Sequence, residues 1–267
     1  MEYTKFAKRR GPYRKALAEI QEMGFTFYDY IHHNPAFAGH MNLSRFLALY
    51  ETYKQTFGLA GHIAEVGVWK ASSLLYFAKL AQIFEPESLT LVHGFDWFRG
   101  TSPGPDEMTA RVQQLWKDSP SSEEENRLRT DKEAAEMYER IKRLIAIQNL
   151  DHVVYLHKLD VTKELDRFFE EHPHIQFKIV FLDAGTYEVV KACLPHFWPR
   201  LTAGGIMILD QFNHEIAPGE TRAVREFLPE MPIHSFVFTN HPSAYIVKPG
   251  AAVSSGLESS VQRQRFA

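Results

Sequence analysis

The sequence contains only one cysteine, Cys193, among 267 residues. A single cysteine excludes an intrachain disulfide and suits a reducing compartment. The sequence also lacks an apolar run of the roughly 20 residues that a membrane-spanning helix needs. Its first thirty residues lack the uninterrupted apolar stretch of a signal peptide. We therefore expect a cytoplasmic protein that has no membrane partner.

The sequence also lacks an excess of charge of either sign. It has 30 lysines and arginines against 33 aspartates and glutamates, for a formal net charge of -3. Proteins that bind nucleic acid through its phosphates need a basic surface, so the overall charge does not support a nucleic-acid partner. A hydrophobic content of 45% is enough for a buried core.

Strand-like and helix-like segments alternate five times after an N-terminal helical region at residues 12–57. The strand-like segments lie at residues 62–68, 89–96, 152–160, 177–185 and 204–211, and the helix-like segments at 72–84, 132–147, 163–172, 189–201 and 219–231. The middle strands are almost continuously apolar, which predicts an α/β fold with a mostly parallel sheet and helices on both faces. A closing hairpin at residues 233–249 adds one antiparallel strand. Two prolines, Pro195 and Pro199, predict a break late in the fourth of these helices.

Acidic residues stand at or near the end of each of the five predicted strands. They are Glu65, Asp96, Asp160, Asp183 and Asp210. The carboxyl ends of parallel strands form the ligand-binding edge of an open α/β sheet. A single acid at a strand end is often a helix cap, but five on one edge indicate a binding site.

The loop after the first strand, "EVGVWKASS", has little glycine. A phosphate-binding loop usually carries two or three glycines, and this one has Gly67 alone. Glu65 would repel a phosphate at the same place. The loop therefore favours a nucleoside cofactor with a positive charge and no phosphate, which describes S-adenosylmethionine.

Four segments in this order resemble a known family. The segments are "AEVGVWKASSLLYFAKL", "VHGFDWF", "FLDAGTYE" and "LPHFWPRLTAGGIMILDQF". Together they resemble class I S-adenosylmethionine-dependent methyltransferases, most closely the macrocin O-methyltransferase-like family, over about residues 61–228. The resemblance implies a Rossmann-like methyltransferase fold with a seven-stranded sheet. It also implies an O-methyltransferase that acts on a small hydroxylated natural product or sugar.

The resemblance assigns the first loop to the cofactor. Five residues would line its methionine and ribose portions: Glu65, Gly67, Val68, Ser72 and Ser73. In the family a further glycine usually stands where this chain has Ala71.

The resemblance places four further residues beside the nucleoside and one beside the methyl group. Asp96, with Trp97 next to it, would accept hydrogen bonds from the ribose hydroxyls. Trp97 has two readings, stacking on the adenosine or packing in the core. Asp160 and Val161 would lie beside the adenine, and Asp183 beneath the transferred methyl group.

The chain departs from the family at two acidic positions. Family members often hold a divalent cation with an aspartate of "LD-x-D" and with an adjacent pair "DD", and the second aspartate of "LD-x-D" can serve as a base. Here Asp183 and Asp210 remain as catalytic and metal-ligand candidates, but Gly185 and Gln211 replace the other two acids. Gln211 offers only a neutral carbonyl, so the sequence leaves the use of Mg²⁺ open.

The missing base leaves the reaction itself less defined. His214, four residues after Asp210, is the candidate catalytic base, with an exposed loop histidine or a cap as the alternative. An acceptor that is already nucleophilic, such as an amine or a phosphorylated group, would need less help. A non-catalytic, methyltransferase-like binding module is a third reading.

The domain organisation follows from these segments. We expect an N-terminal helical extension at residues 1–58, a cofactor-binding domain at 59–250 and a polar tail at 251–267. Within the domain, residues 99–130 form a long polar insertion that we interpret as a lid, with Met108 and Trp116 as acceptor contacts. The aromatic residues of the N-terminal helices either cover the site, complete the core or form a homodimer contact.

Overall fold

The computed structural model describes residues 16–100, 114, 128–215 and 217–250. Most of the predicted lid, including Met108 and Trp116, lies outside the described residues, as does the predicted tail. The description below concerns the helical N-terminal region from residue 16 and the α/β domain.

Seven strands form one sheet in the order β3-β2-β1-β4-β5-β7-β6. The strands are β1 (His62–Val66), β2 (Val92–Asp96), β3 (Val154–Lys158), β4 (Phe177–Leu182), β5 (Leu201–Leu209), β6 (His234–Ser235) and β7 (Ala244–Val247). Strands β1 to β5 pair in parallel, and β7 runs antiparallel to both of its neighbours, β5 and β6. The predicted seven-stranded, mostly parallel sheet with one antiparallel strand is confirmed.

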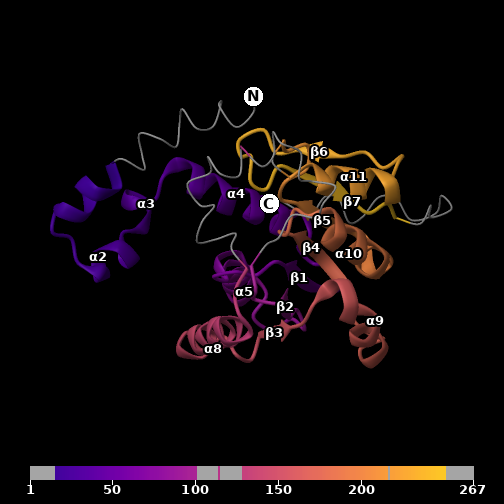
Figure 1. The fold of residues 1–267 in the computed structure, drawn as a ribbon, viewed down its shortest axis with the longest axis horizontal. Coiled ribbons are helices and arrows are strands. Elements are labelled where there is room, and N and C mark those ends of the chain that lie inside the picture. Colours follow the sequence, from indigo (N-terminus) through magenta and orange to yellow (C-terminus); the bar gives the residue numbers. More distant parts are fainter. Residues whose placement is uncertain (1–15, 101–113, 115–127, 216, 251–267) are drawn as a thin grey trace.

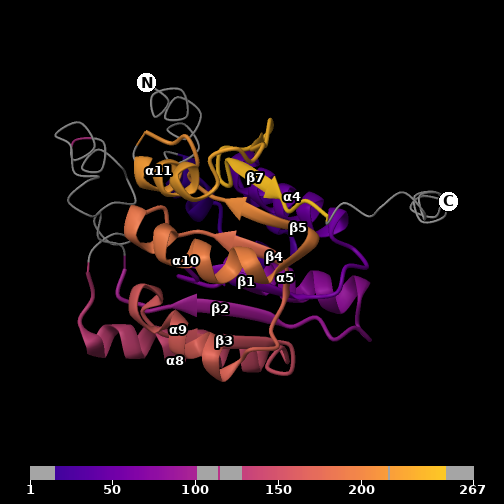
Figure 2. The ribbon, with the colours of Figure 1, turned by 90° about the vertical axis from the view of Figure 1, so that its right-hand side faces the viewer.

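Helices cover both faces of this sheet (Figure 2). One face carries α4 (His40–Gln55), α5 (Ser72–Phe84) and α8 (Asp131–Ile147), and the other carries α9 (Val161–Glu171), α10 (Tyr187–Arg200) and α11 (Pro218–Phe227). Side chains alternate along each strand. In β4, Ile179 and Phe181 therefore enter the core under α4 and α5, and Val180 and Leu182 enter the core under α10.

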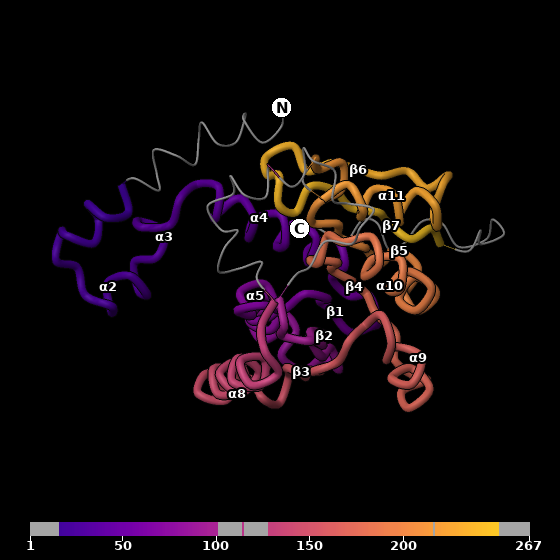
Figure 3. Tube along the Cα trace, viewed as in Figure 1, coloured from indigo at the N-terminus to yellow at the C-terminus, as the bar shows by residue number. Residues whose placement is uncertain are grey.

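The N-terminal helices divide into a part that packs on the domain and a part that extends away from it. Helix α4 packs on α5, with the rings of Phe46 and Tyr76 5.0 Å apart. Helices α2 (Phe27–His32) and α3 (Asn34–Phe37) project away from the sheet in Figures 1 and 3. Thr26 and Asp29 form a capping box at the start of α2. None of the helices in the described ranges has both the length and the apolar composition that crossing a membrane requires.

The predicted break in the fourth helix is wrong, because α10 continues through Pro195 and Pro199 to Arg200. Each proline removes one backbone N–H from the helix. The helix nevertheless buries Leu194 and Phe197 completely against the sheet, and this packing holds the backbone in place. The first strand of the closing hairpin is also shorter than predicted. It pairs over only two residues, at the open edge of the sheet.

Candidate active site

The strand order reverses between β1 and β4, so that the connections from these two strands leave in opposite directions. This arrangement opens a crevice for ligands at the carboxyl ends of the strands. The loop after β1 turns sharply there, with positive φ at Gly67 (93°), Trp69 (49°) and Ala71 (62°). A Cβ atom on Gly67 would collide with the carbonyl oxygen of Asp183. Glycine is therefore required at this position because the loop lies directly against the end of β4.

The resemblance leads one to expect a second glycine at position 71, where this chain has alanine, and the backbone conformation there explains that expectation. The backbone of Ala71 is left-handed, a conformation that glycine adopts without strain and alanine does not. Helix α5 begins at the next residue, Ser72, which is exposed, whereas Ser73 is buried. Val68 is buried in the core, where its side chain lies beside Gly94.

Glu65 is the buried acid of this loop, with only 1% of its surface exposed. Its Oε2 atom has no hydrogen-bond partner among the described residues. Burial, followed by the nearby charge of Asp183, raises the pKa of Glu65 well above its usual value, although Arg45 opposes the shift. The Oε2 atom of Glu65 thus lacks a donor within the part of the chain that the structure describes, and a ligand with an ammonium or hydroxyl group would supply one. Glu65 and the loop therefore fit the cofactor that the resemblance implies.

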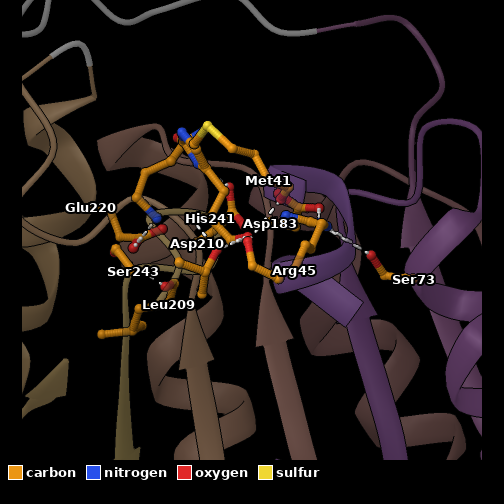
Figure 4. A network of polar contacts seen from close by, with 12 residues as sticks. Met41, Arg45, Ser73, Asp183, Leu209, Asp210, Glu220, His241 and Ser243 are labelled. Atoms are coloured by element: carbon orange, nitrogen blue, oxygen red, sulfur yellow. Dashed lines mark hydrogen bonds and ion pairs between the residues drawn. The ribbon is translucent and has the colours of Figure 1, made fainter. Parts of the chain in front are cut away.

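Asp183 and Asp210 lie at the ends of the adjacent strands β4 and β5, and one arginine joins them (Figure 4). Arg45 Nη2 donates to Asp183 Oδ2 at 2.5 Å, and Arg45 Nη1 donates to Asp210 Oδ1 at 2.6 Å. Burial raises the pKa of Asp183 well above its usual value, with Arg45 opposing and the charge of Asp210 adding to the shift. For Asp210 burial acts in the same direction, but Arg45 and His241 hold its pKa below the usual value.

Further polar residues surround this bridge. His241 Nδ1 donates to Asp210 Oδ2 at 3.0 Å, and its ring lies 4.8 Å from that of His214. Glu220 of α11 is fully buried and accepts from the backbone N–H of Gln211 at 2.9 Å. His214 is buried on the turn after β5, so the alternative of an exposed loop histidine is wrong; its role as a base stays a prediction.

Asp96 holds the loops that follow β1 and β2. Its carboxylate accepts from the backbone N–H of Trp69 at 2.9 Å and of Phe98 at 2.5 Å. Burial raises the pKa of Asp96, against the effect of these two N–H groups. Trp97 lies beside it and donates from Nε1 to the carbonyl oxygen of Gly100 at 2.7 Å. The predicted contacts of Asp96 and Trp97 with the nucleoside stay predictions.

Asp160 follows the outer strand β3, next to the end of β2, where the backbone N–H of Leu159 donates to the carbonyl oxygen of Asp96 at 3.1 Å. It caps α9 by accepting from Thr162 N at 3.0 Å, and it pairs with Lys163 at 2.7 Å. Val161 is the first residue of that helix and is buried. The structure thus brings Glu65, Asp183 and Asp210 together near Asp96, whereas Asp160 has the local contacts of a helix cap.

The residues predicted to bind a divalent cation do not fit that role. The guanidinium of Arg45 lies between Asp183 and Asp210, where a shared cation would lie. The side-chain oxygen of Gln211 lies against the Cα atom of Gly185, in the space that a side chain on Gly185 would need. Among the described residues, no three histidine, cysteine, aspartate or glutamate side chains are grouped as a metal site requires.

Sequence reasoning missed Arg45, His241 and Glu220. Arg45 lies three and four residues before the buried Ala48 and Leu49, so helical periodicity places a cation on the buried face of α4. This periodicity is the signal in the sequence from which Arg45 could have been predicted. His241 lies in a segment that reads as a turn, and Glu220 in the first turn of a helix, where acids are common.

Comparisons with known proteins identify the family of this chain and proteins of similar fold. The sequence model of a family described as "Methyltransferase domain" matches residues 64–212. A search of curated protein sequences finds no match. Among solved structures, the calicheamicin methyltransferase CalS11 is similar with a TM-score of 0.71 at 22% identity, over 90% of this chain and 92% of that one. The O-methyltransferase NovP is similar with a TM-score of 0.59 at 16% identity, over 77% and 80%.

A second structure of CalS11, in the apo form, is titled a TDP-rhamnose 3'-O-methyltransferase of calicheamicin biosynthesis. It matches with a TM-score of 0.63 at 22% identity, over 90% of this chain and 93% of that one. At these identities the likeness concerns the fold.

Proposed function

This chain belongs to the methyltransferase domain family, and we propose that it transfers a methyl group from S-adenosylmethionine to a hydroxyl oxygen of a small natural product or sugar. The fold similarity to CalS11 and NovP supports this choice of acceptor, since both are O-methyltransferases by title. Methyltransferase folds serve many acceptors, so the acceptor class is the part of the proposal that most needs a test.

The observation that carries the proposal is the buried Glu65 beside the Gly67 loop, whose Oε2 atom has no hydrogen-bond partner within the described ranges of the chain. Its surroundings include Asp183, Asp96 and Asp210, whose negative charges all raise its pKa. A phosphate in this place would meet several carboxyl groups, and the nearby cation, Arg45, is already paired with Asp183 and Asp210. A cofactor with an ammonium group, ribose hydroxyls and a sulfonium is attracted to the same groups.

The chain's own residues divide the work of binding and orientation. Glu65, Gly67, Val68, Ser72 and Ser73 would hold the methionine and ribose portions. When bound, S-adenosylmethionine supplies the methyl group, whose bond to the acceptor oxygen forms as its bond to sulfur breaks, with the electron pair remaining on sulfur and the hydroxyl proton passing to a base. The rate then depends mainly on how closely the protein aligns the acceptor with the methyl group.

The remaining predicted contacts belong to the nucleoside and to the reaction centre. Asp96 and Trp97 would contact the ribose and adenosine, and Asp160 and Val161 the adenine. Asp183 would lie beneath the methyl group. Asp210 would help to orient the acceptor, and His214 stays the candidate for the base.

Isothermal titration with S-adenosylhomocysteine tests cofactor binding. We expect the wild type to bind one molecule per chain and Glu65→Gln to bind at least about tenfold more weakly, because a charge-assisted hydrogen bond becomes a neutral one. Glu87→Gln, which changes an exposed glutamate, is the matched control and should bind like the wild type. If the wild type does not bind S-adenosylhomocysteine, the proposal is wrong.

A methyl-transfer assay tests the acceptor class. Labelled S-adenosylmethionine is supplied with a panel of nucleotide sugars, glycosides, phenols and matched amines, and products are identified by mass spectrometry. We expect methylation of a hydroxyl group. Transfer to amines alone, with the hydroxylated members untouched, would contradict the proposal.

Homodimer formation and a cytoplasmic location are further parts of the proposal, as is the division into an extension at 1–58 and a domain at 59–250. Helix α2 exposes large apolar side chains, including Phe27 at 81% and Tyr28 at 64%. Such surfaces often mark contacts between proteins. Light scattering on the wild type and on Phe27→Ser tests the dimer, which should weaken in the variant.

A further inference from the structure

The positive charge beside Asp183 and Asp210 comes from a side chain of the protein, the guanidinium of Arg45. Arg45 reaches from α4 and engages Asp183 with one terminal nitrogen and Asp210 with the other, at 2.5 and 2.6 Å. We propose that the guanidinium of Arg45 takes the place of a divalent cation between Asp183 and Asp210, so that the protein transfers methyl groups without a metal. The role of Arg45 in catalysis rests on the proposed methyl transfer, whereas the contacts of Arg45 with the two aspartates do not depend on that proposal.

The guanidinium is held by its surroundings as well as by the two acids. Ser73 Oγ accepts from Arg45 Nη2 at 3.1 Å and from Nε at 3.3 Å, and the ring of Phe181 lies 5.1 Å from the guanidinium carbon. The helix that carries Arg45 is anchored by Ala48 and Leu49, which are fully buried. Because α4 is packed in the core, the cation is present wherever the domain is folded.

Asp210 has both of its oxygens in use. Oδ1 accepts from Arg45 and Oδ2 accepts from His241, and only 4% of its side chain is exposed. A divalent cation would have to displace one of these donors. It would then lie beside a guanidinium, which keeps its charge at any pH at which the protein is folded. Repulsion between the two positive charges therefore works against metal binding.

The two substituted positions fit the same conclusion. The resemblance described above leads one to expect acids where this chain has Gly185 and Gln211. Here both residues are neutral. The amide oxygen of Gln211 fills the space beside Gly185 in which a side chain at position 185 would lie. A site with fewer carboxylates needs less positive charge, and a single guanidinium shared by two aspartates supplies it.

Arg45 is accordingly a positioning residue. Its two hydrogen bonds fix the orientation of Asp183 relative to Asp210, and its charge offsets theirs while an acceptor hydroxyl approaches. Charge-assisted hydrogen bonds of this kind are short and directional. A small displacement of either aspartate would misalign the acceptor and slow the transfer.

Titration with Mn²⁺, followed by electron paramagnetic resonance, tests the inference directly. The samples are the wild type, Arg45→Ala, Arg45→Lys and Lys54→Met, each with and without S-adenosylhomocysteine. We expect no uptake of Mn²⁺ by the wild type. Arg45→Ala should bind one Mn²⁺ per chain, because two neighbouring carboxylates that have lost the guanidinium between them attract a hard cation. Lys54→Met removes an exposed charge from the same helix and should behave like the wild type.

Methyl transfer, measured on the acceptor from the panel above, supplies the second readout. Wild-type activity should be unchanged by EDTA. Arg45→Ala should lose on the order of 100-fold in kcat, and added guanidinium ion should restore part of the rate. Arg45→Lys, which keeps the charge, should retain an intermediate rate and should not gain the Mn²⁺ site, and it serves as the test if Arg45→Ala does not fold.

The inference is overturned if the wild type takes up one Mn²⁺ per chain, if EDTA abolishes its activity, or if Arg45→Ala keeps the wild-type rate. Failure of the proposed function has a different signature. In that case the wild type does not bind S-adenosylhomocysteine, while the Mn²⁺ titrations of the wild type and Arg45→Ala still decide whether the guanidinium takes the place of a metal.

Discussion

At Gly67 the backbone of the first loop lies directly against the end of β4. The φ of this glycine is 93°, and a Cβ atom would meet the carbonyl oxygen of Asp183. We expect Gly67→Ala to lower the free energy of unfolding by about 3 kcal/mol, the sum of a left-handed alanine and an overpacked contact. Urea denaturation measures it.

Gly58 provides the matched control for that substitution. Its φ of 77° is also left-handed, but a Cβ atom there would meet nothing within 4 Å. Gly58→Ala should therefore cost only the backbone strain, about 1 kcal/mol. Equal costs at the two positions would show that the contact with Asp183 contributes nothing.

Gly185 and Gln211 form a pair whose substitutions depend on each other. A side chain on Gly185 would overlap the amide oxygen of Gln211, and the φ of Gly185 is 66°. We expect Gly185→Ala to destabilise the protein, and to cost about 1 kcal/mol less when Gln211→Ala is already present. A double-mutant cycle from urea denaturation gives the coupling energy. Additive effects would mean that the amide moves aside freely.

At the scale of elements, one buried ion pair ties α4, the end of α5 and β4 together. Lys178 of β4 is fully buried and pairs with Glu85 at 2.5 Å, and the hydroxyl of Tyr53 donates to the same carboxylate. Glu85→Ala leaves a buried ammonium without its partner, so we expect a loss of about 3–5 kcal/mol in the free energy of unfolding.

The double variant Glu85→Ala with Lys178→Met separates the cost of an unpaired charge from the loss of packing. Methionine fills much of the space of lysine without its charge. We expect the double variant to recover at least about 2 kcal/mol of the loss, since a buried ion pair can often be replaced by apolar residues. A double variant that is less stable than Glu85→Ala would contradict this explanation.

The elements themselves were largely predictable, because their signals are local. The apolar periodicity of residues 72–84 predicted the observed bounds of α5, Ser72–Phe84. The prolines of α10 misled the prediction, because the packing of Leu194 and Phe197 that holds this helix together is a tertiary contact. Local propensity does not report such contacts.

The site was predictable only in part for the same reason. The acids at the strand ends follow from strand periodicity, so Asp183 and Asp210 could be placed on one edge. Their partner Arg45 is 138 and 165 residues away in the sequence, on a helix that reads as an extension. Nothing local to Arg45 shows which strands α4 covers. The charge balance of the site therefore depended on a contact that only the folded chain reveals.

At the scale of the whole molecule, the sheet carries two groups of ionisable side chains. One is the polar site at the carboxyl ends of the strands, and the other is a cluster of histidines along strands β1, β2 and β3. His93 of β2 and His157 of β3 share a hydrogen bond of 3.0 Å, and His62 and Tyr155 lie against His93. Burial, followed by the neighbouring histidines, lowers the pKa of His93 from 6.5 to about 3 and that of His157 to about 4. The folded protein therefore keeps both rings neutral.

These lowered pKa values predict how the stability of the whole fold depends on pH. As the pH falls below 6.5, the unfolded chain binds protons at these histidines before the folded chain does. Their contribution is fully present above that pH and is lost as the pH falls toward about 4 for His157 and about 3 for His93. The slope is up to about 1.4 kcal/mol per pH unit for each histidine.

His93→Phe removes one of these titrations while keeping an aromatic ring in the core. We expect its free energy of unfolding, measured by urea denaturation across this pH range, to fall less steeply than that of the wild type. His234→Phe changes an exposed histidine and serves as the control, with the wild-type slope. Because acidic groups titrate in both proteins, the difference between the variant and the wild type isolates the histidine. Equal slopes in His93→Phe and the wild type would mean that His93 is protonated equally in the folded and unfolded states.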